Sequence, residues 1–191
     1  MTTARLEAFS DAVIAIVITI MVLELRIPHE ADLLALREVA PVLLVYVLSF
    51  VHLAIYWNNH HHLMVLTDRI NGKILWANVH LLFWLSLVPF TTGWMGESHF
   101  AAVPTAVYGV DLLLAAIAYF ILQTAIIAEQ GPNSKLANAL GRDLKGKSSP
   151  VLYISAIPLA FVSRWIALGL YVLVALIWLI PDRRIESVVA D

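Results

Sequence analysis

The sequence predicts an all-α polytopic membrane protein that forms a single domain over residues 1–191, with six transmembrane helices and both termini in the cytoplasm. Three observations lead to this fold class. The chain is 61% hydrophobic and only 14% charged, whereas a soluble domain carries about 25% charged residues. Several apolar stretches are long enough to cross a bilayer. The Lys and Arg residues are concentrated between alternate stretches.

A transmembrane helix needs about 20 mostly apolar residues, because the hydrocarbon core is about 30 Å thick and each helical residue rises about 1.5 Å. Four stretches meet this requirement in turn: residues 8–27, 41–66, 74–95 and 102–128. The first of them is expected to be a retained helix and not a signal peptide, because it ends in Glu24-Leu25-Arg26 without a small-residue cleavage site.

The last apolar stretch, residues 150–180, is too long for one span and short for two. Ser163 and Arg164 lie near its middle. A charged Arg at the bilayer centre is costly, so two short helices, 150–163 and 165–180, are the better interpretation. The polar segment 129–149 is expected to be a long cytoplasmic loop.

The positive charges give an independent test of this topology, because cytoplasmic loops carry an excess of Lys and Arg. With six spans and a cytoplasmic N-terminus, nine basic residues lie inside and three outside. Those inside are Arg5, Arg69, Lys73, Lys135, Arg142, Lys145, Lys147, Arg183 and Arg184, and those outside are Arg26, Arg37 and Arg164. Merging the last two helices weakens the bias, so six spans are favoured.

The composition excludes several classes of function. Too few charges are present for a water-soluble enzyme or a disordered chain, and a net charge of -2 does not provide the basic surface of a nucleic-acid binder. The sequence has no Cys, hence no disulfide or thiolate metal site. No HExxH, GxSxG or phosphate-loop motif indicates an enzyme, and no cofactor is expected.

Polar residues cluster at the cytoplasmic ends of the first three spans. Ser10 and Asp11 open the first, Trp57 to His62 end the second, and Asn78 and His80 lie in the third. An ionised carboxylate at the membrane edge needs hydrogen-bond donors. We therefore expect a polar network that joins these three helices.

The His triplet at positions 60–62 also raises the possibility of a metal site, because imidazole is a common zinc ligand. Successive helical residues point about 100° apart, so the three rings cannot converge on one ion, and no metal site is predicted. His52 and His99 are expected to be structural. Asp111 is either a proton-relay residue or a helix–helix hydrogen-bonding group. Trp94, Tyr153 and Trp165 fit interfacial aromatic belts.

The middle of the first span, from Ala12 to Leu23, has no charge. Ile16, Ile20 and Leu23 follow i, i+4, i+7 spacing and form one stripe, with Thr19 beside it. Such a stripe forms either an ordinary packing surface or a hydrophobic pore constriction, which controls conduction by width and wetting. Val17 and Met21 are expected on the lipid side.

The pattern Arg-x-x-x-Phe-Ser-Asp at Arg5, Phe9, Ser10 and Asp11, at the start of the first of six spans, resembles the transmembrane protein 175 family of potassium channels. These channels are lysosomal and endosomal in animals, where they have two repeats, and they have single-repeat bacterial relatives. The one six-helix repeat expected here resembles the bacterial form. The residues that continue the resemblance in the second and third spans are Trp57, His60, His61 and Asn78.

The resemblance implies a potassium-selective, leak-type channel in the cell (inner or plasma) membrane. It implies a homotetramer in contact with lipid, without a nucleic-acid partner, in which the first helix of each subunit lines a central pore. Ile16, Ile20 and Leu23 would form the constriction and Thr19 a polar ring, while the motif residues would hold the first three helices together. Potassium would be the permeant ion. The Thr-Val-Gly-Tyr-Gly filter of ordinary potassium channels is absent.

The alternative is a proton- or cation-coupled secondary transporter. Such transporters commonly show inverted repeats or broken helices near the bilayer midplane. Neither feature is evident in this sequence.

Overall fold

The computed structural model describes residues 1–28, 31–140 and 144–179, and the elements of this part of the chain are all helical. They are α1 (Thr3–Leu23), α2 (Ala35–Val65), α3 (Gly72–Glu97), α4 (Ala102–Gln130), α5 (Lys135–Leu140), α6 (Leu144–Val162) and α7 (Arg164–Leu179). The all-α prediction is confirmed.

Four helices, α1 to α4, are long and apolar enough to cross a membrane. The apolar parts of α6 and α7, Ser148–Val162 and Arg164–Leu179, are shorter. The count of six spans and the position of the termini therefore stay predictions. Arg142, Arg183 and Arg184, which contributed to the topology prediction, lie outside the described residues, as does the last residue of the span predicted over 165–180.

Several helix ends differ from the predicted bounds because local capping, not hydropathy, fixes them. The Thr2 side chain accepts a hydrogen bond from the Arg5 amide and caps α1. Helix α1 therefore begins at Thr3, five residues before the start expected at residue 8. The Asp32 carboxylate accepts from the Ala35 amide (2.8 Å) at the start of α2. The segment 129–149, expected to be a loop, contains α5 and the first turns of α6.

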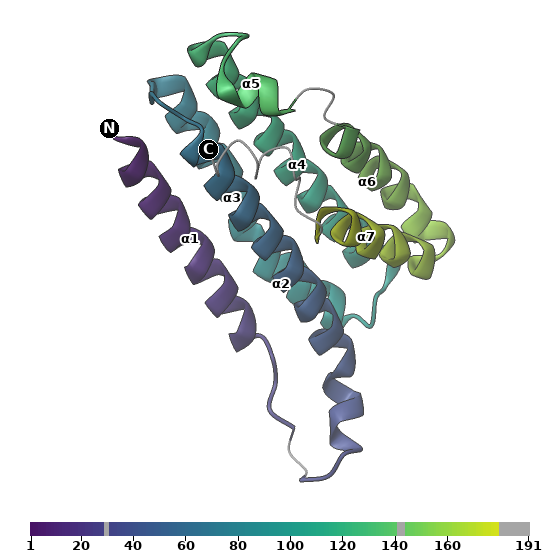
Figure 1. Cartoon of the computed structure of the whole chain (residues 1–191). Helices are drawn as coiled ribbons and strands as arrows, with labels where there is room; N and C mark the ends of the chain where they lie inside the picture. The colour runs from purple at the N-terminus through teal and green to yellow at the C-terminus, as the bar shows by residue number, and fades with distance from the viewer. Residues whose placement is uncertain (29–30, 141–143, 180–191) are drawn as a thin grey trace.

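The helices pack side by side in one bundle, with α1 at its edge (Figure 1). Helix α1 contacts α2 and α3, α3 and α4 pack together, and α6 covers α4. Helix α7 closes the bundle against α6, α2 and α4. One face of α1 is therefore buried, and the opposite face packs against no other helix of the described part of the chain.

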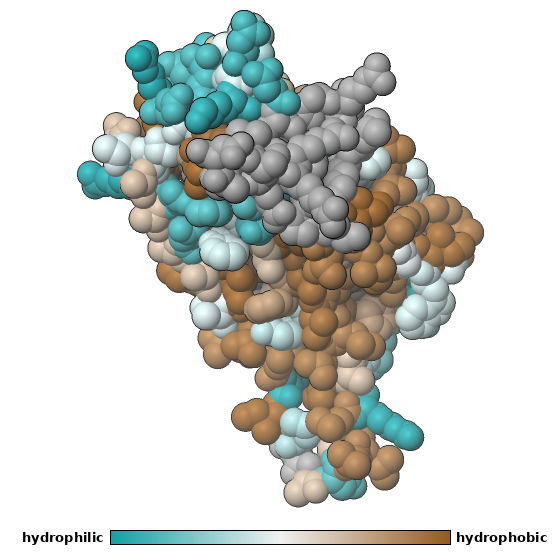
Figure 2. Space-filling model, in the orientation of Figure 1, coloured by the Kyte–Doolittle hydropathy of each residue, from teal (hydrophilic) through white to brown (hydrophobic). Residues whose placement is uncertain are grey.

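The surface of the bundle has the pattern expected of a membrane protein. Figure 2 shows hydrophobic side chains over the middle of the visible face and hydrophilic side chains at the end that carries α5. Exposed apolar residues occur on every long helix, for example Leu44 on α2, Phe90 on α3 and Phe120 on α4. A soluble protein rarely exposes such a continuous apolar surface, so the chain is suited to lipid contact.

Helix α6 ends at Val162 and α7 begins at Arg164, so the chain reverses direction at Ser163. The Arg164 guanidinium donates a hydrogen bond to the His99 carbonyl (3.1 Å) and lies 5.3 Å from the centre of the Trp165 ring. These contacts join the α6–α7 turn to the α3–α4 turn and satisfy the charge outside the apolar part of the bundle.

Candidate functional site

One face of α1 is anchored in the subunit core. Leu6, Ser10, Ile14, Val17 and Met21 recur at helical spacing, and all five side chains are buried. Val17 is 5% and Met21 is 1% exposed, so the expectation that they face lipid is wrong. They lie seven and eleven residues after Ser10, which places them on the face that Ser10 directs toward α3.

A buried chain of hydrogen bonds joins α1, α3 and α2. Asn78 Nδ2 donates to Ser10 Oγ (2.9 Å), and Ser10 Oγ donates to the Leu6 carbonyl (2.9 Å). His60 Nε2 donates to Asn78 Oδ1 (2.7 Å), so the His60 proton lies on Nε2. Since Ser10, His60 and Asn78 are completely buried, each of these bonds satisfies a group that water cannot reach.

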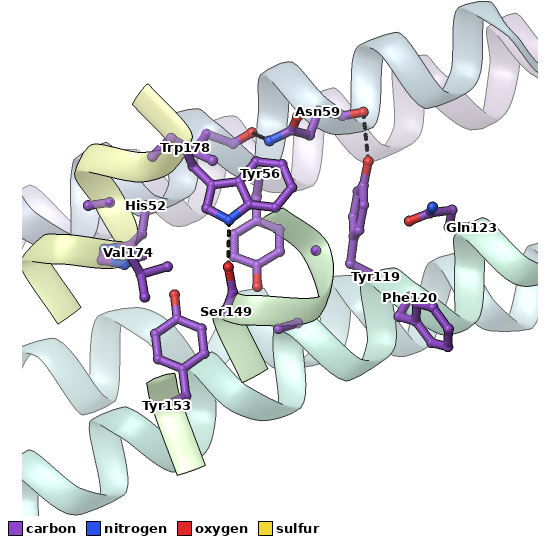
Figure 3. Close-up of a pocket in the computed structure, with 14 residues that line it drawn as sticks. His52, Tyr56, Asn59, Tyr119, Phe120, Gln123, Ser149, Tyr153, Val174 and Trp178 are labelled. Atoms are coloured by element: carbon purple, nitrogen blue, oxygen red, sulfur yellow. Dashed lines mark hydrogen bonds between the residues drawn. The ribbon is translucent and has the colours of Figure 1, made fainter. Parts of the chain in front are cut away.

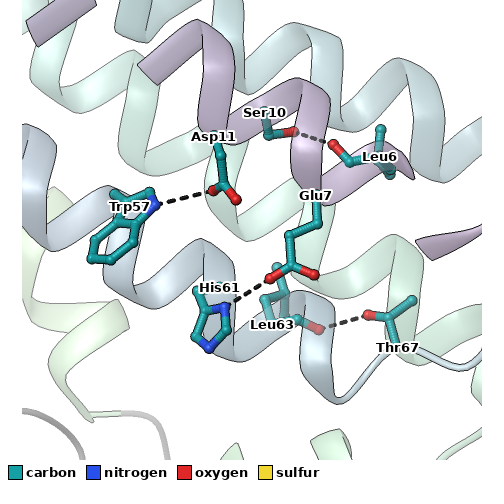
Figure 4. Close-up of polar contacts among 8 residues, drawn as sticks. All are labelled: Leu6, Glu7, Ser10, Asp11, Trp57, His61, Leu63 and Thr67. Atoms are coloured by element: carbon teal, nitrogen blue, oxygen red, sulfur yellow. Dashed lines mark hydrogen bonds and ion pairs between the residues drawn. The ribbon is translucent and has the colours of Figure 1, made fainter. Parts of the chain in front are cut away.

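A second set of contacts joins α1 to α2 at the partly exposed side of the same helices. Trp57 Nε1 donates to Asp11 Oδ1 (3.0 Å), and His61 Nδ1 donates to Glu7 Oε1 (2.7 Å), as Figure 4 shows. Glu7 was not among the sequence-derived site residues. Its signal was its spacing, because Glu7 and Asp11 are four residues apart, as are Trp57 and His61.

The structure places the remaining motif residues outside this network. Arg5 and Phe9 lie on the exposed side of α1, and the Arg5 guanidinium has no hydrogen-bond or ion-pair partner among the described residues. His80 is also exposed and accepts a hydrogen bond from Trp84 on its own helix (2.9 Å). Within one chain, Ser10 and Asp11 are therefore the motif residues that hold the first three helices together.

The exposed face of α1 is uncharged and mostly apolar from Ala12 to Leu23. Ile16 is 56%, Ile20 is 45% and Leu23 is 78% exposed, and Thr19 lies between them. The Thr19 hydroxyl donates to the Ile16 carbonyl (2.9 Å), which satisfies its proton within the helix. These four residues thus present methyl groups, one hydroxyl oxygen and no charge to whatever covers this face.

A groove of about 710 Å³ runs between the second half of α1 and the second half of α3. Ile16, Ile20, Phe90 and Trp94 are among its apolar walls, and Glu24 and Glu97 lie at one end. The Glu97 carboxylate pairs with Arg26 at 2.5 Å. The groove is thus apolar along most of its length and polar near the end of α1.

The other buried polar residues lie away from α1. Thr91 Oγ1 donates to Asp111 Oδ2 (3.0 Å), which joins α3 to α4. Thr92 Oγ1 donates to Ser49 Oγ (2.7 Å), and Ser49 Oγ lies 3.0 Å from the Tyr108 hydroxyl. Asp111 thus forms a hydrogen bond between helices, as one of the two interpretations of this residue predicted. Within the described residues, no group of three or more His, Asp or Glu residues is arranged to hold a metal ion.

The fold and its exposed apolar surface define a multi-pass membrane protein. A family model described as "Endosomal/lysosomal potassium channel TMEM175" matches residues 5–89, a range that contains the whole polar network around Ser10 and Asp11. A potassium channel from Chryseobacterium sp. (strain P1-3) is 54% identical over 187 residues, covering 98% of this chain and 97% of that protein.

A second potassium channel, from Chamaesiphon minutus, is 30% identical, with 91% of this chain and 92% of that protein covered. The crystal structure of a lysosomal potassium-selective channel TMEM175 homolog from Chamaesiphon minutus superposes with a TM-score of 0.81, at 28% identity. The match covers 94% of this chain and 97% of that one. The chain belongs to the TMEM175 family of potassium channels. The resemblance carried by the motif is confirmed, and the family consists of ion channels, not enzymes.

Proposed function

We propose that this protein is a potassium-selective, leak-type channel of the cell (inner or plasma) membrane, formed by four copies of the chain. The first helix, α1, of each subunit lines the central pore. Ile16, Ile20 and Leu23 form the constriction, and Thr19 contributes a polar ring. The permeant species is the potassium ion, and the channel uses no cofactor and no nucleic-acid partner.

The observation that carries this proposal is the two-sided character of α1. Its polar residues, Ser10 and Asp11, are hydrogen-bonded within the subunit, whereas its exposed face is apolar around Ile16, Ile20 and Leu23. A single helix cannot enclose a conduction path, so several copies must meet around an axis. The relatives that share this fold are named potassium channels.

An apolar constriction selects ions differently from a ring of carbonyl groups. Ile and Leu side chains offer no oxygen to replace the hydration shell, so the barrier depends on the width of the ring and on the cost of wetting it. Potassium holds its shell less tightly than sodium and distorts it more readily. A narrow ring of methyl groups therefore favours potassium without a binding site.

The lipid bilayer is the second partner in this proposal. Phe120 on α4 and Phe161 on α6 are both more than half exposed, and neither lines the groove that contains Ile16 and Ile20. These aromatic side chains are suited to acyl chains at the outer surface of the tetramer.

The experiment that tests the proposal is a planar-bilayer recording of the purified protein under opposed potassium and sodium gradients. A channel gives unitary currents that vary linearly with voltage and reverse near the potassium equilibrium potential. A coupled transporter gives no unitary steps, and its reversal potential shifts with the gradient of the coupling ion. The second result would overturn the proposal.

A further inference from the structure

A small cavity lies inside the subunit, between α2, α4, α6 and α7. Its volume is about 60 Å³, and Figure 3 shows the side chains around it. No residue of α1 lines it, so it is separate from the helix assigned to the pore. It shares α2 with the network described above, because Tyr56 precedes Trp57 in the sequence.

Two tyrosine side chains line this cavity, Tyr153 on α6 and Tyr56 on α2. Tyr153 is 2% exposed and Tyr56 is partly buried. Neither hydroxyl is hydrogen-bonded to another described residue. Figure 3 shows both hydroxyl groups directed toward the space beside Ser149. Both hydroxyl groups are therefore available to form a hydrogen bond with a small molecule bound in the cavity.

His52 adds an acceptor to the same wall. Its Nδ1 lies 2.9 Å from the Leu48 carbonyl, and a carbonyl can only accept, so Nδ1 carries the proton and Nε2 has a free lone pair. Nε2 is buried and lacks a partner among the described residues. The cavity therefore offers two hydroxyl groups that donate or accept and one nitrogen that accepts.

The rest of the described lining is uncharged and mostly apolar, with the amide side chains of Asn59 and Gln123 as exceptions. Ile55, Ala116 and Val174 form part of the wall, as does Trp178, whose Nε1 donates to Ser149 Oγ (2.7 Å). None of the described lining residues is Asp, Glu, Lys or Arg. The described lining offers an ion no counter-charge for its lost hydration, so it suits an uncharged ligand better than a charged one.

We propose that this cavity is a binding site for a small uncharged alcohol, whose hydroxyl group pairs with Tyr153, Tyr56 or His52 and whose apolar body lies against Ile55, Ala116 and Val174. A hydroxyl group matches the lining because it donates and accepts at once. The size also matches: 60 Å³ has room for about four water molecules, which is close to the size of propanol or butanol.

The test uses the full-length protein in lipid nanodiscs and a butanol analogue that carries a photoreactive diazirine. After irradiation, peptide mass spectrometry locates the adducts. We expect them on the α2 and α6 peptides that contain Tyr56 and Tyr153, and we expect excess butanol to suppress them. A diazirine-bearing butane without the hydroxyl group serves as the matched probe and should label these peptides several-fold less.

Tyr153→Phe keeps the ring and removes the hydroxyl, and it breaks no hydrogen bond within the described part of the chain. It should lower labelling about three- to tenfold, the range that corresponds to one neutral hydrogen bond. Tyr46→Phe, on α2 but away from the cavity, is the control and should leave labelling unchanged. Ala116→Leu, which fills the space, should abolish labelling while the protein stays folded by circular dichroism.

Adducts spread over the lipid-facing residues, or equal labelling of the wild type and Tyr153→Phe, would overturn the inference. Absence of any adduct in the cavity would show that it holds only water and would also overturn it. The experiment needs no ion conduction, so its outcome is independent of the proposed channel function.

Discussion

Asp11 and Trp57 lie 46 positions apart in the sequence, and the indole nitrogen of Trp57 donates a hydrogen bond of 3.0 Å to the carboxylate of Asp11. One helical turn away, His61 donates to Glu7. As the chain advances from Glu7 to Asp11 on α1, the partner on α2 retreats from His61 to Trp57. The two contacts therefore fix the antiparallel register of α1 and α2, and with it the rotation of α1 about its own axis.

The first prediction concerns this register. Asp11→Ala and Trp57→Phe should each lower the thermal unfolding midpoint in detergent, and the double variant should lose no more than the more damaging single change. We expect a coupling free energy of about 0.5–1.5 kcal/mol, since both side chains are partly exposed and solvent weakens the bond. Trp76→Phe, at an exposed position of α3, is the matched control. Fully additive losses would show that the contact does not couple the helices.

The second prediction concerns the buried link through Asn78. Asn78→Ala removes the acceptor of His60 and the donor to Ser10. An orphaned buried group costs about 1–3 kcal/mol, which corresponds to several degrees in the unfolding midpoint for a chain of this size. Asn58→Ala on α2, which breaks no hydrogen bond among the described residues, should shift the midpoint far less. Equal shifts in the two variants would contradict the assigned role of Asn78.

The third prediction separates conduction from stability. Ile20→Ala and Leu23→Ala should widen the constriction, raise the unitary conductance and reduce the preference for potassium over sodium, and replacement of either residue by Asn should act in the same direction by wetting the ring. Unfolding midpoints should change little, because these side chains are exposed in the subunit. Bilayer recordings measure both properties of the current.

Two controls accompany this test. Ile154→Ala lies on α6 at an exposed position and should leave reversal potentials unchanged. Val17→Ala removes buried methyl groups and should lower stability by about 1–3 kcal/mol. Altered selectivity in the Ile154 variant, together with normal selectivity in the Ile20 and Leu23 variants, would show that α1 does not form the constriction.

The fourth prediction concerns the packing of α4 on α7. A Cβ atom at Gly109 would lie 2.1 Å from the Tyr171 hydroxyl, so Gly109→Ala forces the helices apart and should cost about 1–3 kcal/mol. Tyr171→Phe removes the clashing oxygen but also its hydrogen bond to the Thr105 carbonyl (3.0 Å), so it should cost less in the Gly109→Ala background than in the wild type. Gly169→Ala meets nothing within 4 Å and should be neutral or stabilising, because Ala favours a helix. A stable Gly109→Ala variant would mean that α4 and α7 pack less closely.

The fifth prediction concerns assembly. Native mass spectrometry of the protein in mild detergent should show a tetramer of the 191-residue chain. Leu23→Asp, on the exposed face of α1, should reduce the tetramer fraction through charge repulsion at the axis. Ile154→Asp, on α6, should leave the tetramer fraction unchanged. A monomer or dimer as the main species of the wild type would contradict the proposed pore.

The sequence predicted the fold class well because an apolar stretch in lipid has few alternatives to a helix. The sequence also located the break between α6 and α7 near Ser163, because a charged Arg164 at the bilayer centre would cost free energy. Motif residues Ser10 and Asp11, with their partners on α2 and α3, were predicted as a network, because buried polar groups must find partners. Each of these features follows from the free-energy cost of placing a polar or charged group in an apolar setting, and such groups can be identified in the local sequence.

The rotation of α1 was predicted less well, and its composition explains why. Residues on all sides of this helix are apolar between Ala12 and Leu23, so hydropathy does not distinguish a packed face from a free one. Val17 and Met21 were misassigned for this reason, although their spacing from Ser10 would have placed them correctly. Tyr153 was expected at the membrane interface, yet it is buried. Its burial comes from the packing of α6 against α4, which local sequence does not reveal.

The division of α1 into an anchored face and a free face also bears on how such a channel evolves. Substitutions at Ile16, Thr19, Ile20 and Leu23 disturb no side chain of the subunit core, so a lineage can alter the pore surface while its folding stays under separate selection. A laboratory library randomised at these four positions would consequently contain mostly well-folded subunits. Variants with different ion preferences could then be screened, and few of them would be lost to misfolding.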